Sequence, residues 1–387
     1  MPESITLVSL MLHALKCVSV QDIFDRDPYE SRRPALKGET LLHVLVAYQM
    51  VRQPGIRGLT RAIEEYAPLQ AALGGPVARN TLANALSQRS VEQMTAAWMR
   101  VSACYGAGVE CLGKKVARIA LVDSSLLKRS LTVYDWAEYR QESGAANRHA
   151  VLEWTRRIPT QVVVTAGKVH DAHRAVPMSW KPGWTYVQDR GYVSFARLAQ
   201  MRICGAHFVV RLKRGVQWHV LARRSVPLGP PHGVYLRGDQ TVRLAGWPEV
   251  ELRLVSYQLP DYRGVWVVTD RFDLTASSLA RLYKERWKIE NCWKWIKARL
   301  KIKRPLGEGA TALPLQLIAA FVTDLLWRVF KACGHFPASL YEFVTRCQEL
   351  SLVRLADRTD GALRQALERI HQHFTQLLVP SQAPLSL

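Results

Sequence analysis

The sequence is short of acidic residues and of paired cysteines. Its 387 residues hold 32 Asp and Glu against 53 Lys and Arg, for a net charge of +21 at pH 7. The seven cysteines are scattered, odd in number and without a Cys-x-x-Cys pair. This usage argues against a disulfide-stapled secreted domain and against a structural zinc site, and it is typical of a protein of a reducing cytoplasm.

Long apolar runs and two common catalytic loops are also missing. No stretch of about 18 uncharged apolar residues occurs, so we expect no membrane span. No basic segment precedes the apolar residues 5–15, so we expect no signal peptide. There is no Gly-x-Ser-x-Gly elbow, and Lys115 follows Gly108-x4-Gly113-Lys114 where a phosphate-binding loop needs Ser or Thr.

Positive charge is what the sequence has in excess. The hydrophobic share of 48% and the 12 Trp indicate a folded protein, so the charge is carried on a globular surface. An excess this large predicts a polyanionic partner, because neutralising phosphates releases condensed counterions. Between residues 281 and 304 only Glu285 and Glu290 stand among ten cations, which are Arg281, Lys284, Arg286, Lys288, Lys294, Lys297, Arg299, Lys301, Lys303 and Arg304.

The N-terminal region, residues 1–115, is predicted to be helical. Apolar spacing predicts helices over 39–53 and 59–66, and a short helix with an Asn or Thr cap over 79–89. Because this short helix follows a Gly-Gly-Pro break, it resembles the recognition half of a helix-turn-helix, with an ordinary helical bundle as the alternative. Residues 1–115 are therefore a candidate DNA-binding domain.

The centre of the chain predicts an α/β fold. In residues 116–212 a helix over 195–203 stands among apolar strands, predicted at 117–122, 162–164, 184–188 and 208–212. Gly and Pro break residues 213–262 into short alternating segments, which predicts a β-rich insertion.

The remaining parts of the chain return to the core and then become helical. Residues 263–304 resume the core with a strand over 264–270 and a long helix that Thr275 or Ser277 can cap. Residues 305–387 read as a Pro/Gly linker followed by helices.

One helical face carries an unusual set of side chains. Tyr283, Arg286, Glu290 and Lys297 fall within an arc of roughly 60° if the segment is one helix. A simple salt bridge needs only one partner at i+4, whereas a carboxylate ringed by cations and a phenol suits a metal ligand beside a gripped phosphodiester. The alternative is an amphipathic basic helix on a core, with Trp287 and Trp293 as packing.

Two more carboxylates are placed where such chemistry needs them. Metal-dependent phosphodiester cleavage requires acidic ligands that hold two divalent ions about 3.5–4 Å apart. Asp123 and Asp189 each follow an apolar strand, from which a side chain can project at a sheet edge. Taken singly, each could instead be a turn or loop residue, and Glu290 could be a partner of Lys294.

Together the motifs resemble a known family. The spacing Tyr-x2-Arg-x3-Glu-x6-Lys and the segment Asp189-Arg190-Gly191-Tyr192 are similar to signatures of bacterial insertion-sequence DDE transposases of the insertion-sequence-four type. The resemblance extends over about residues 117–300. It implies a ribonuclease-H-like core interrupted by a β-rich insertion, between helical N-terminal and C-terminal regions.

The resemblance also implies roles for single residues. Asp123, Asp189 and Glu290 would be the catalytic triad and the ligands of two Mg²⁺ ions, for which Mn²⁺ can substitute. The residues that would contact DNA are Tyr283, Arg286, Lys294, Lys297, Arg190 and Trp266. Trp266 would stack on an unpaired base, with a buried strand tryptophan as the alternative.

The implied activity is cut-and-paste transposition in the bacterial cytoplasm, in association with the nucleoid. The partners would be double-stranded DNA, as terminal inverted repeats and target, and a second subunit bound through the helices of 305–387. A catalytically silent, domesticated DNA-binding protein and a ribonuclease-H-fold nuclease are the rival interpretations.

The charge predicts how binding responds to salt. Because each neutralised phosphate contributes about −0.9 to the log–log slope, affinity for duplex DNA should fall steeply between low and physiological salt. Fluorescence anisotropy with a labelled duplex measures the slope. A slope near zero would mean that the basic surface faces another kind of partner.

Overall fold

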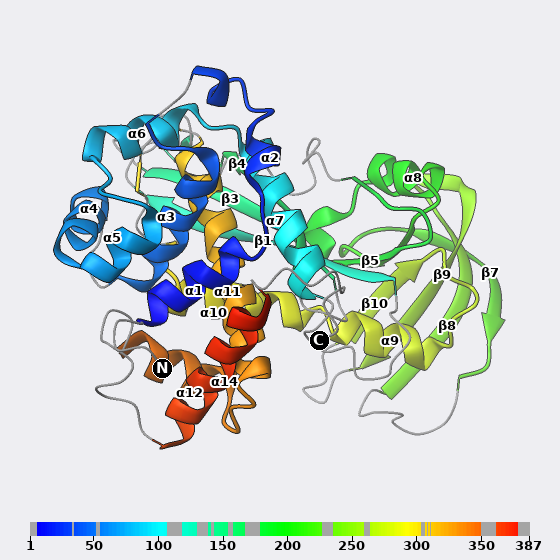
Figure 1. Ribbon diagram of the computed structural model, residues 1–387. Coiled ribbons are helices and arrows are strands. Elements are labelled where there is room, and N and C mark those ends of the chain that lie inside the picture. The colour runs from blue at the N-terminus through cyan, green and yellow to red at the C-terminus, as the bar shows by residue number, and fades with distance from the viewer. Residues whose placement is uncertain are drawn as a thin grey trace. The chain divides into compact units, whose positions relative to one another are not determined.

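The computed structural model describes most of the chain in two compact units. The described residues are 6–32, 35–51, 55–106, 118–129, 138–140, 143–153, 158–166, 179–226, 235–258, 264–302, 306–307, 309, 311–349 and 361–377. One unit, the helical unit, joins residues 1–114 to 295–387, and the other, the sheet unit, comprises residues 115–294 (Figure 1). The N-terminal and C-terminal regions of the chain therefore share one unit, and the predicted functional division of these regions stays a prediction.

The helical unit is assembled around one apolar helix, α11 (Ala312–Cys333), which packs against α3, α6, α7, α12 and α14 (Figure 1). By length and composition alone α11 is apolar enough to cross a membrane, although it is not an uncharged stretch, since it contains Asp324, Arg328 and Lys331. However, 89% of its apolar window is buried inside the unit, as in the core helix of a folded domain. The other helices are α1 (Leu7–Lys16), α2 (Gln21–Phe24), η1 (Glu30–Arg32), α3 (Gly38–Met50), α4 (Gly55–Glu65), α5 (Ala67–Leu73), α6 (Arg79–Gln88), α7 (Val91–Gly106), α12 (Leu340–Glu349) and α14 (Gly361–Leu377).

Helix α6 is the segment that resembled a recognition helix. It buries Leu82, Ala85 and Leu86, and its other positions are mostly exposed. The predicted Asn or Thr cap was wrong, because the N-cap is Ala78 and no side chain caps the helix. The helix-turn-helix interpretation stays a prediction.

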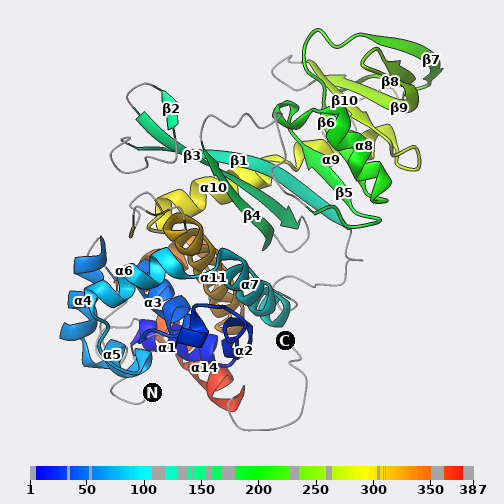
Figure 2. The ribbon, with the colours of Figure 1, turned by 90° about the horizontal axis from the view of Figure 1, so that it is seen from above.

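The sheet unit contains a mixed sheet of ten strands, which confirms the predicted α/β class in its coarse form. The strand order is β2-β3-β1-β5-β6-β10-β9-β8-β7, with β4 paired to β3 (Figure 2). The pairs β1–β5 and β5–β6 are parallel, and all the other pairs are antiparallel. The strands are β1 (Ile119–Arg129), β2 (Glu138–Arg140), β3 (Ser143–Glu153), β4 (Ile158–Ala166), β5 (Thr185–Gln188), β6 (His207–Arg211), β7 (Trp218–Arg224), β8 (Tyr235–Leu244), β9 (Trp247–Gln258) and β10 (Gly264–Thr269).

Several strands differ from the predicted ones. Strand β1 continues to Arg129, so the prediction that it ends before Asp123 was wrong; after Val122 it goes on pairing with β3. Within residues 213–262, where short segments were predicted, residues 235–244 form one longer strand, β8, with register shifts in its pairing with β9. Strand β3 was not predicted, because its residues 143–149 carry no apolar alternation.

Successive side chains of a strand point to opposite faces of the sheet, so apolar residues on a face need a covering layer. Helices supply that layer here. Phe208 and Val210 of β6 share a buried cluster with Leu198 and Met201 of α8 (Phe195–Ile203). Helix α9 (Ala276–Lys284) packs against β5, β6, β8 and β9. Thr275 caps α9, as predicted, by accepting a hydrogen bond from the Ser278 N–H at 3.1 Å.

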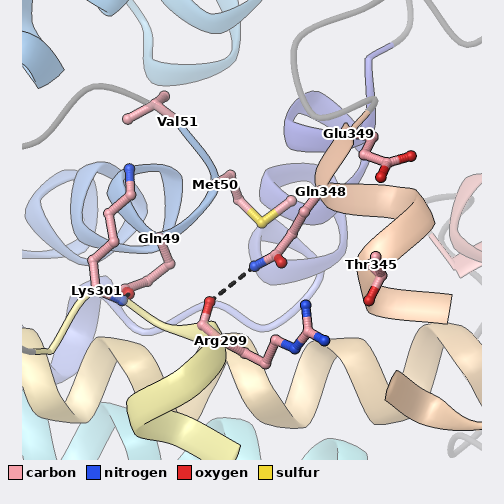
Figure 3. Close-up of a pocket in the computed structure, with 8 residues that line it drawn as sticks. All are labelled: Gln49, Met50, Val51, Arg299, Lys301, Thr345, Gln348 and Glu349. Atoms are coloured by element: carbon pink, nitrogen blue, oxygen red, sulfur yellow. Dashed lines mark hydrogen bonds between the residues drawn. The ribbon is translucent and has the colours of Figure 1, made fainter. Parts of the chain in front are cut away.

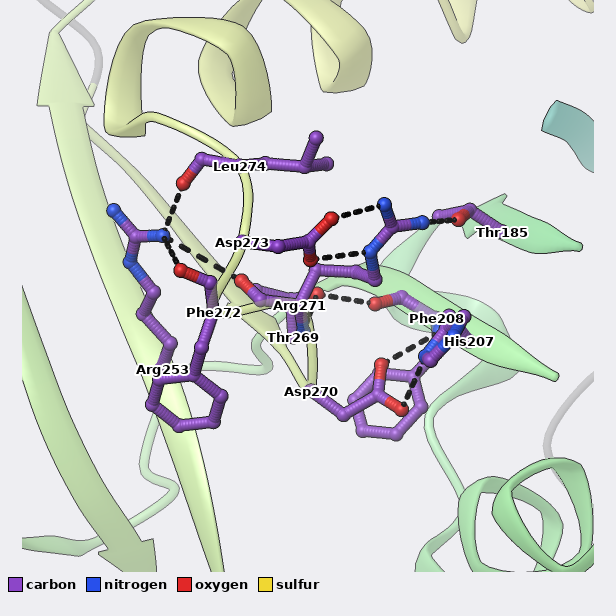
Figure 4. A network of polar contacts seen from close by, with 10 residues as sticks. All are labelled: Thr185, His207, Phe208, Arg253, Thr269, Asp270, Arg271, Phe272, Asp273 and Leu274. Atoms are coloured by element: carbon purple, nitrogen blue, oxygen red, sulfur yellow. Dashed lines mark hydrogen bonds and ion pairs between the residues drawn. The ribbon is translucent and has the colours of Figure 1, made fainter. Parts of the chain in front are cut away.

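A buried ion pair fixes the turn that leads from β10 into α9. Arg253 of β9 makes a two-pronged contact with Asp239 of β8, with Nη2–Oδ2 and Nε–Oδ1 distances of 2.6 and 2.8 Å. The third guanidinium nitrogen donates to the carbonyl oxygen of Leu274 and lies 3.5 Å from those of Arg271 and Phe272 (Figure 4). One side chain therefore satisfies both a buried carboxylate and the backbone just before α9.

Residues of β5 and β6 contact the other side of the turn between β10 and α9. Asp270 accepts a hydrogen bond from the Phe208 N–H at 3.1 Å and lies 3.0 Å from His207 Nδ1. Arg271 pairs with Asp273 and donates to the hydroxyl of Thr185 at the start of β5 (Figure 4). Together with the contact from Arg253 of β9, these contacts tie the turn before α9 to three strands, β5, β6 and β9, and so they set the position of the helix that follows.

The ion pair of Arg253 gives a stability prediction. Arg253→Met should lower the free energy of unfolding by about 3–5 kcal/mol, because it leaves Asp239 buried without its main partner. The matched control is Arg243→Met, which breaks the exposed 2.8 Å pair with Glu251 on the same strands and should cost less than about 1 kcal/mol. Urea denaturation followed by tryptophan fluorescence measures both. Equal effects would show that burial of the pair does not matter.

Candidate active site

The two aspartates follow residues that are directly paired in the sheet. Strands β1 and β5 are parallel, and the last pair in their register is Val122 opposite Gln188. Asp123 and Asp189 are the next residues on the two strands. Since neighbouring strands lie about 4.8 Å apart, the backbone brings these positions side by side at one edge of the β1–β5 pair. The side chain of Asp123 lies outside the described residues.

Asp189 leaves the sheet at the end of β5 and begins the short helix η2 (Arg190–Tyr192). Its carboxylate is half-buried, and its Oδ1 accepts a hydrogen bond from the Tyr283 hydroxyl at 3.0 Å. Burial, and next the charge of Asp189, raise the pKa of Tyr283 well above its usual value. The phenol therefore keeps its proton and remains a donor to Asp189.

The predicted single helix around Glu290 is broken in two. Helix α9 ends at Lys284, Glu285 and Arg286 form a turn, and α10 (Trp287–Arg299) begins after it. In this turn the Arg286 N–H bonds the Tyr283 carbonyl at 3.1 Å and the Lys288 N–H bonds the Glu285 carbonyl at 2.9 Å, a spacing of three residues and not four. The common arc calculated for one continuous helix was therefore wrong.

Tertiary and ion-pair contacts still connect these motif residues. Arg286 is 8% exposed, and its Nη2 lies 2.7 Å from Glu290 Oε1. The guanidinium also lies 5.9 Å from the centre of the Tyr283 ring. A chain of contacts thus runs from Asp189 through Tyr283 and Arg286 to Glu290. In each carboxylate one oxygen is engaged by a donor that fixes the direction of the side chain.

Among the described side chains, no group of three His, Cys, Asp or Glu could hold a metal ion by itself. Of the predicted triad, the side chains of Asp189 and Glu290 are among those described, and that of Asp123 is not. The donor set is all carboxylate oxygen, which suits Mg²⁺ and Mn²⁺ and not a thiolate-binding metal.

The other predicted DNA-contacting residues are mostly accessible. Arg190 and Lys294 are exposed, and Lys294 Nζ lies 5.7 Å from the centre of the Trp287 ring. Lys297 is half-buried on α10. Trp266 of β10 is 46% exposed, so the alternative of a buried strand tryptophan is wrong.

Of the two tryptophans predicted to be core, only one is. Trp293 is buried, whereas Trp287 is 51% exposed at the start of α10. The break after Lys284 changes the direction of the helical faces, so a spacing argument made for one helix misplaces Trp287. The centre of its ring lies 5.9 Å from the Arg286 guanidinium carbon and 5.7 Å from Lys294 Nζ.

A small cavity beside the motif brings in residues that the sequence did not single out. Its volume is about 80 Å³, and the lining residues are Arg211, Tyr257, Val265, Tyr283, Lys284, Arg286 and Trp287. Three of them are cations and none is a carboxylate. Arg211 ends β6 and Tyr257 lies on β9, so no spacing in the sequence relates them to the motif on α9 and α10. Burial raises the pKa of Tyr257 well above its usual value.

The hydrogen bond between Tyr283 and Asp189 can be tested through stability. Tyr283→Phe keeps the buried ring but removes the donor, and it should lower the free energy of unfolding by about 1–3 kcal/mol. Tyr235→Phe, which removes an exposed hydroxyl from β8, is the matched control and should change stability by less than about 0.5 kcal/mol. A Tyr283→Phe protein as stable as the wild type would mean that the bond is not made in solution.

More than half of the chain is similar to known transposases. Residues 114–323 match the family described as "Transposase DDE domain". A Sinorhizobium fredii protein described as transposase y4zB is 28% identical over 238 residues, which are 60% of this chain and 67% of that protein. A Synechocystis protein described as a transposase for insertion sequence element IS4SA is 23% identical over 44% of this chain and 49% of its own length. The cryo-EM structure of a piggyBac transposase synaptic complex with hairpin DNA aligns with 100% of this chain and 88% of that chain, at 10% identity and a TM-score of 0.41.

Proposed function

The chain belongs to the family of DDE transposases, and we propose that Asp123, Asp189 and Glu290 are the metal-binding carboxylates with which it cleaves and joins DNA. The family match covers more than half of the chain, and it confirms the resemblance to insertion-sequence transposases found in the sequence. The protein is thus a DNA transposase, a polynucleotidyl transferase by family. Its ribonuclease-H-like core, residue roles, metal and assembly are parts of the proposal.

The parallel pairing of β1 with β5 is the observation that carries the assignment. It brings two acidic positions, 66 residues apart in sequence, to adjacent strands at the same level. The contacts from Tyr283 and Arg286 then relate Glu290 to the same edge. If these carboxylates served only in turns or surface salt bridges, they would not have to lie close to one another.

The residues present fit a pair of divalent ions. When bound, Mg²⁺ ions would supply an activated water or hydroxyl and would stabilise the leaving oxygen. The chain itself must aim the carboxylates. Tyr283 holds one oxygen of Asp189, and Arg286 holds one oxygen of Glu290, as outer-shell groups commonly do around ligands. Arg286 is thus a positioning residue for Glu290 in addition to its predicted role in DNA binding.

The accessible cations and aromatics would hold the DNA strand next to the carboxylates. Lys294, Lys297 and Arg190 carry the charge that a phosphate backbone requires. Trp266 presents an exposed ring from β10, which supports its predicted stacking on an unpaired base.

Transposition also sets the assembly and the reaction sequence that we propose. After the first nick, the freed 3′-hydroxyl of the element end attacks the phosphodiester of the opposite strand, which closes a hairpin on the element end and releases the flanking DNA with its own 3′-hydroxyl. Water then hydrolyses the hairpin, and the regenerated 3′-hydroxyl of the element attacks a phosphodiester of the target DNA, whose own 3′-hydroxyl is the leaving group. Both ends of an element must be held together, so a homodimer on the terminal inverted repeats is the smallest sufficient complex. We place the reaction in the bacterial cytoplasm, at the nucleoid.

An assay for strand joining separates this function from its rivals. Purified protein is incubated with a pre-cleaved element end, a supercoiled target plasmid and Mg²⁺. Joined products support a transposase, nicking without joining supports a ribonuclease-H-fold nuclease, and DNA binding without either supports a catalytically silent, domesticated protein.

The carboxylate assignment predicts a specific separation of activities. Asp123→Asn, Asp189→Asn and Glu290→Gln should each abolish Mg²⁺-dependent strand cleavage while DNA affinity changes less than about threefold, because each removes a metal ligand and not a phosphate contact. Glu249→Gln, at an exposed carboxylate on β9, is the control and should cleave normally. Cleavage at wild-type rates by any of the three variants would remove that residue from the triad.

A further inference from the structure

The helical unit contains a pocket at the end of α10 that the proposed active site does not use. Its volume is about 310 Å³. Three segments far apart in sequence line it (Figure 3). They are the end of α3 (Gln49 to Val51), the end of α10 with Arg299 and the following Lys301, and α12 with Thr345, Gln348 and Glu349. We call it the α10-end pocket.

Three glutamine side chains form hydrogen bonds with the backbone of the two cationic residues of this pocket, Arg299 and Lys301. Gln49 Oε1 accepts the Lys301 N–H at 2.7 Å, and Gln316 Nε2 donates to the Lys301 carbonyl. Gln348 Nε2 donates to the Arg299 carbonyl at 2.9 Å (Figure 3). Gln49 and Gln316 are both buried. Backbone groups at a helix end, which lack partners within the helix, are thus bonded by side chains of α3, α11 and α12.

The side chains of the two cations are also positioned, because each lies over a tyrosine ring. The Arg299 guanidinium carbon is 3.6 Å from the centre of the Tyr341 ring, and Lys301 Nζ is 4.8 Å from the centre of the Tyr48 ring. Within the described part of the chain, the Arg299 guanidinium forms no hydrogen bond and no ion pair. Its planar set of N–H donors is therefore oriented by stacking while it remains available to a ligand.

The charge of the pocket favours an anion. Two cations line it against one carboxylate, Glu349 of α12. Burial lowers the pKa of Lys301 to about 8, so the amine is still mostly protonated at neutral pH. A bound anion would offset the cost of burying that charge.

We propose that the α10-end pocket binds a phosphate group of the DNA backbone. The inference rests on the proposed function, since it makes the pocket an additional contact to the same DNA. The arginine fork matches phosphate oxygens, and the volume is enough for a phosphate with part of its nucleotide. Arg299 and Lys301 belong to the basic segment 281–304 of a chain with a net charge of +21, which favours DNA over a small free anion.

Chemical labelling of the wild-type protein tests the proposal. Burial lowers the pKa of Lys301 to about 8, so at pH 8 more of its amine is unprotonated than in an ordinary lysine. The aldehyde of pyridoxal 5′-phosphate should therefore react there, and borohydride fixes the adduct for peptide mapping. Duplex DNA should protect Lys301 at least fivefold but leave Lys331 of α11 unprotected. Equal labelling of Lys301 with and without DNA, or protection by inorganic phosphate but not by DNA, would overturn the proposal.

Matched substitutions give a second measurement. Arg299→Gln and Lys301→Gln should each weaken DNA binding about tenfold, as expected for a lost charge-assisted contact. Lys331→Gln removes the same charge from the same unit, outside the pocket, and should weaken binding less than about twofold. An equal loss in Lys331→Gln would mean that only net charge matters, and it would contradict the proposal. If Lys301→Gln does not fold by circular dichroism, Arg299→Gln and the labelling of the wild type decide.

The proposal for the α10-end pocket and the proposal for the active site can be rejected separately. In Asp189→Asn protein, DNA should still protect Lys301, because the pocket is independent of the carboxylates. Unprotected Lys301 in a protein that cleaves DNA normally would reject the pocket alone. Cleavage that persists in Asp189→Asn, with Lys301 protected, would reject the carboxylate assignment alone.

Discussion

Four residue pairs hold β1 and β5 in parallel register, from Ile119 opposite Thr185 to Val122 opposite Gln188. Because side chains alternate between the faces of a strand, a slip of one residue would turn one aspartate of the pair to the other face. The register itself is held by packing, since Val122, Tyr186 and Phe208 share one buried cluster across three strands. The geometry of the proposed metal site is therefore a consequence of how the apolar core of the sheet packs.

The third carboxylate depends on a different kind of constraint. Glu290 lies on α10, and nothing in the sheet register fixes its direction. The buried pair of Arg253 with Asp239 holds the turn before α9, the hydroxyl of Tyr283 reaches back to Asp189, and Arg286 pairs with Glu290. Each contact is modest, but together they orient the helix and the carboxylate. Such outer contacts decide whether three acidic residues form a metal site or three separate surface charges.

In the helical unit, contacts from neighbouring side chains likewise orient charged groups, here the two cations of the α10-end pocket. Arg299 and Lys301 would be two more surface cations if the end of α10 and the residues after it were not held by other helices. Three glutamines bond its backbone, and two tyrosine rings support the charged groups, so the cations are held in fixed directions. Preorganised cations lose less conformational entropy on binding than mobile ones, which is why the pocket is a better phosphate site than an exposed lysine.

The sequence by itself determined the chemistry that is available and much of the local structure. Apolar runs predicted β5, β6 and β10, and the helical period predicted α8. Thr275, which caps α9, was one of the two residues expected to do so. Residue types at fixed spacing singled out the three carboxylates and indicated the family, because metal ligands and phosphate contacts need particular functional groups whatever the surrounding fold.

Tertiary structure alone decided where those groups lie. No Gly or Pro marks the break at Glu285 and Arg286, and strand β3 has no alternation to reveal it. The contacts of Tyr283 with Asp189, of Arg286 with Glu290 and of the glutamines with residues 299–301 did not enter the sequence interpretation. Such contacts join segments that are far apart in sequence, and they can outweigh the preference of a segment to form one continuous helix. Their energies arise only when the chain packs. Sequence patterns record local periodicity and functional groups, whereas the directions of side chains follow from burial and hydrogen bonding in the folded molecule.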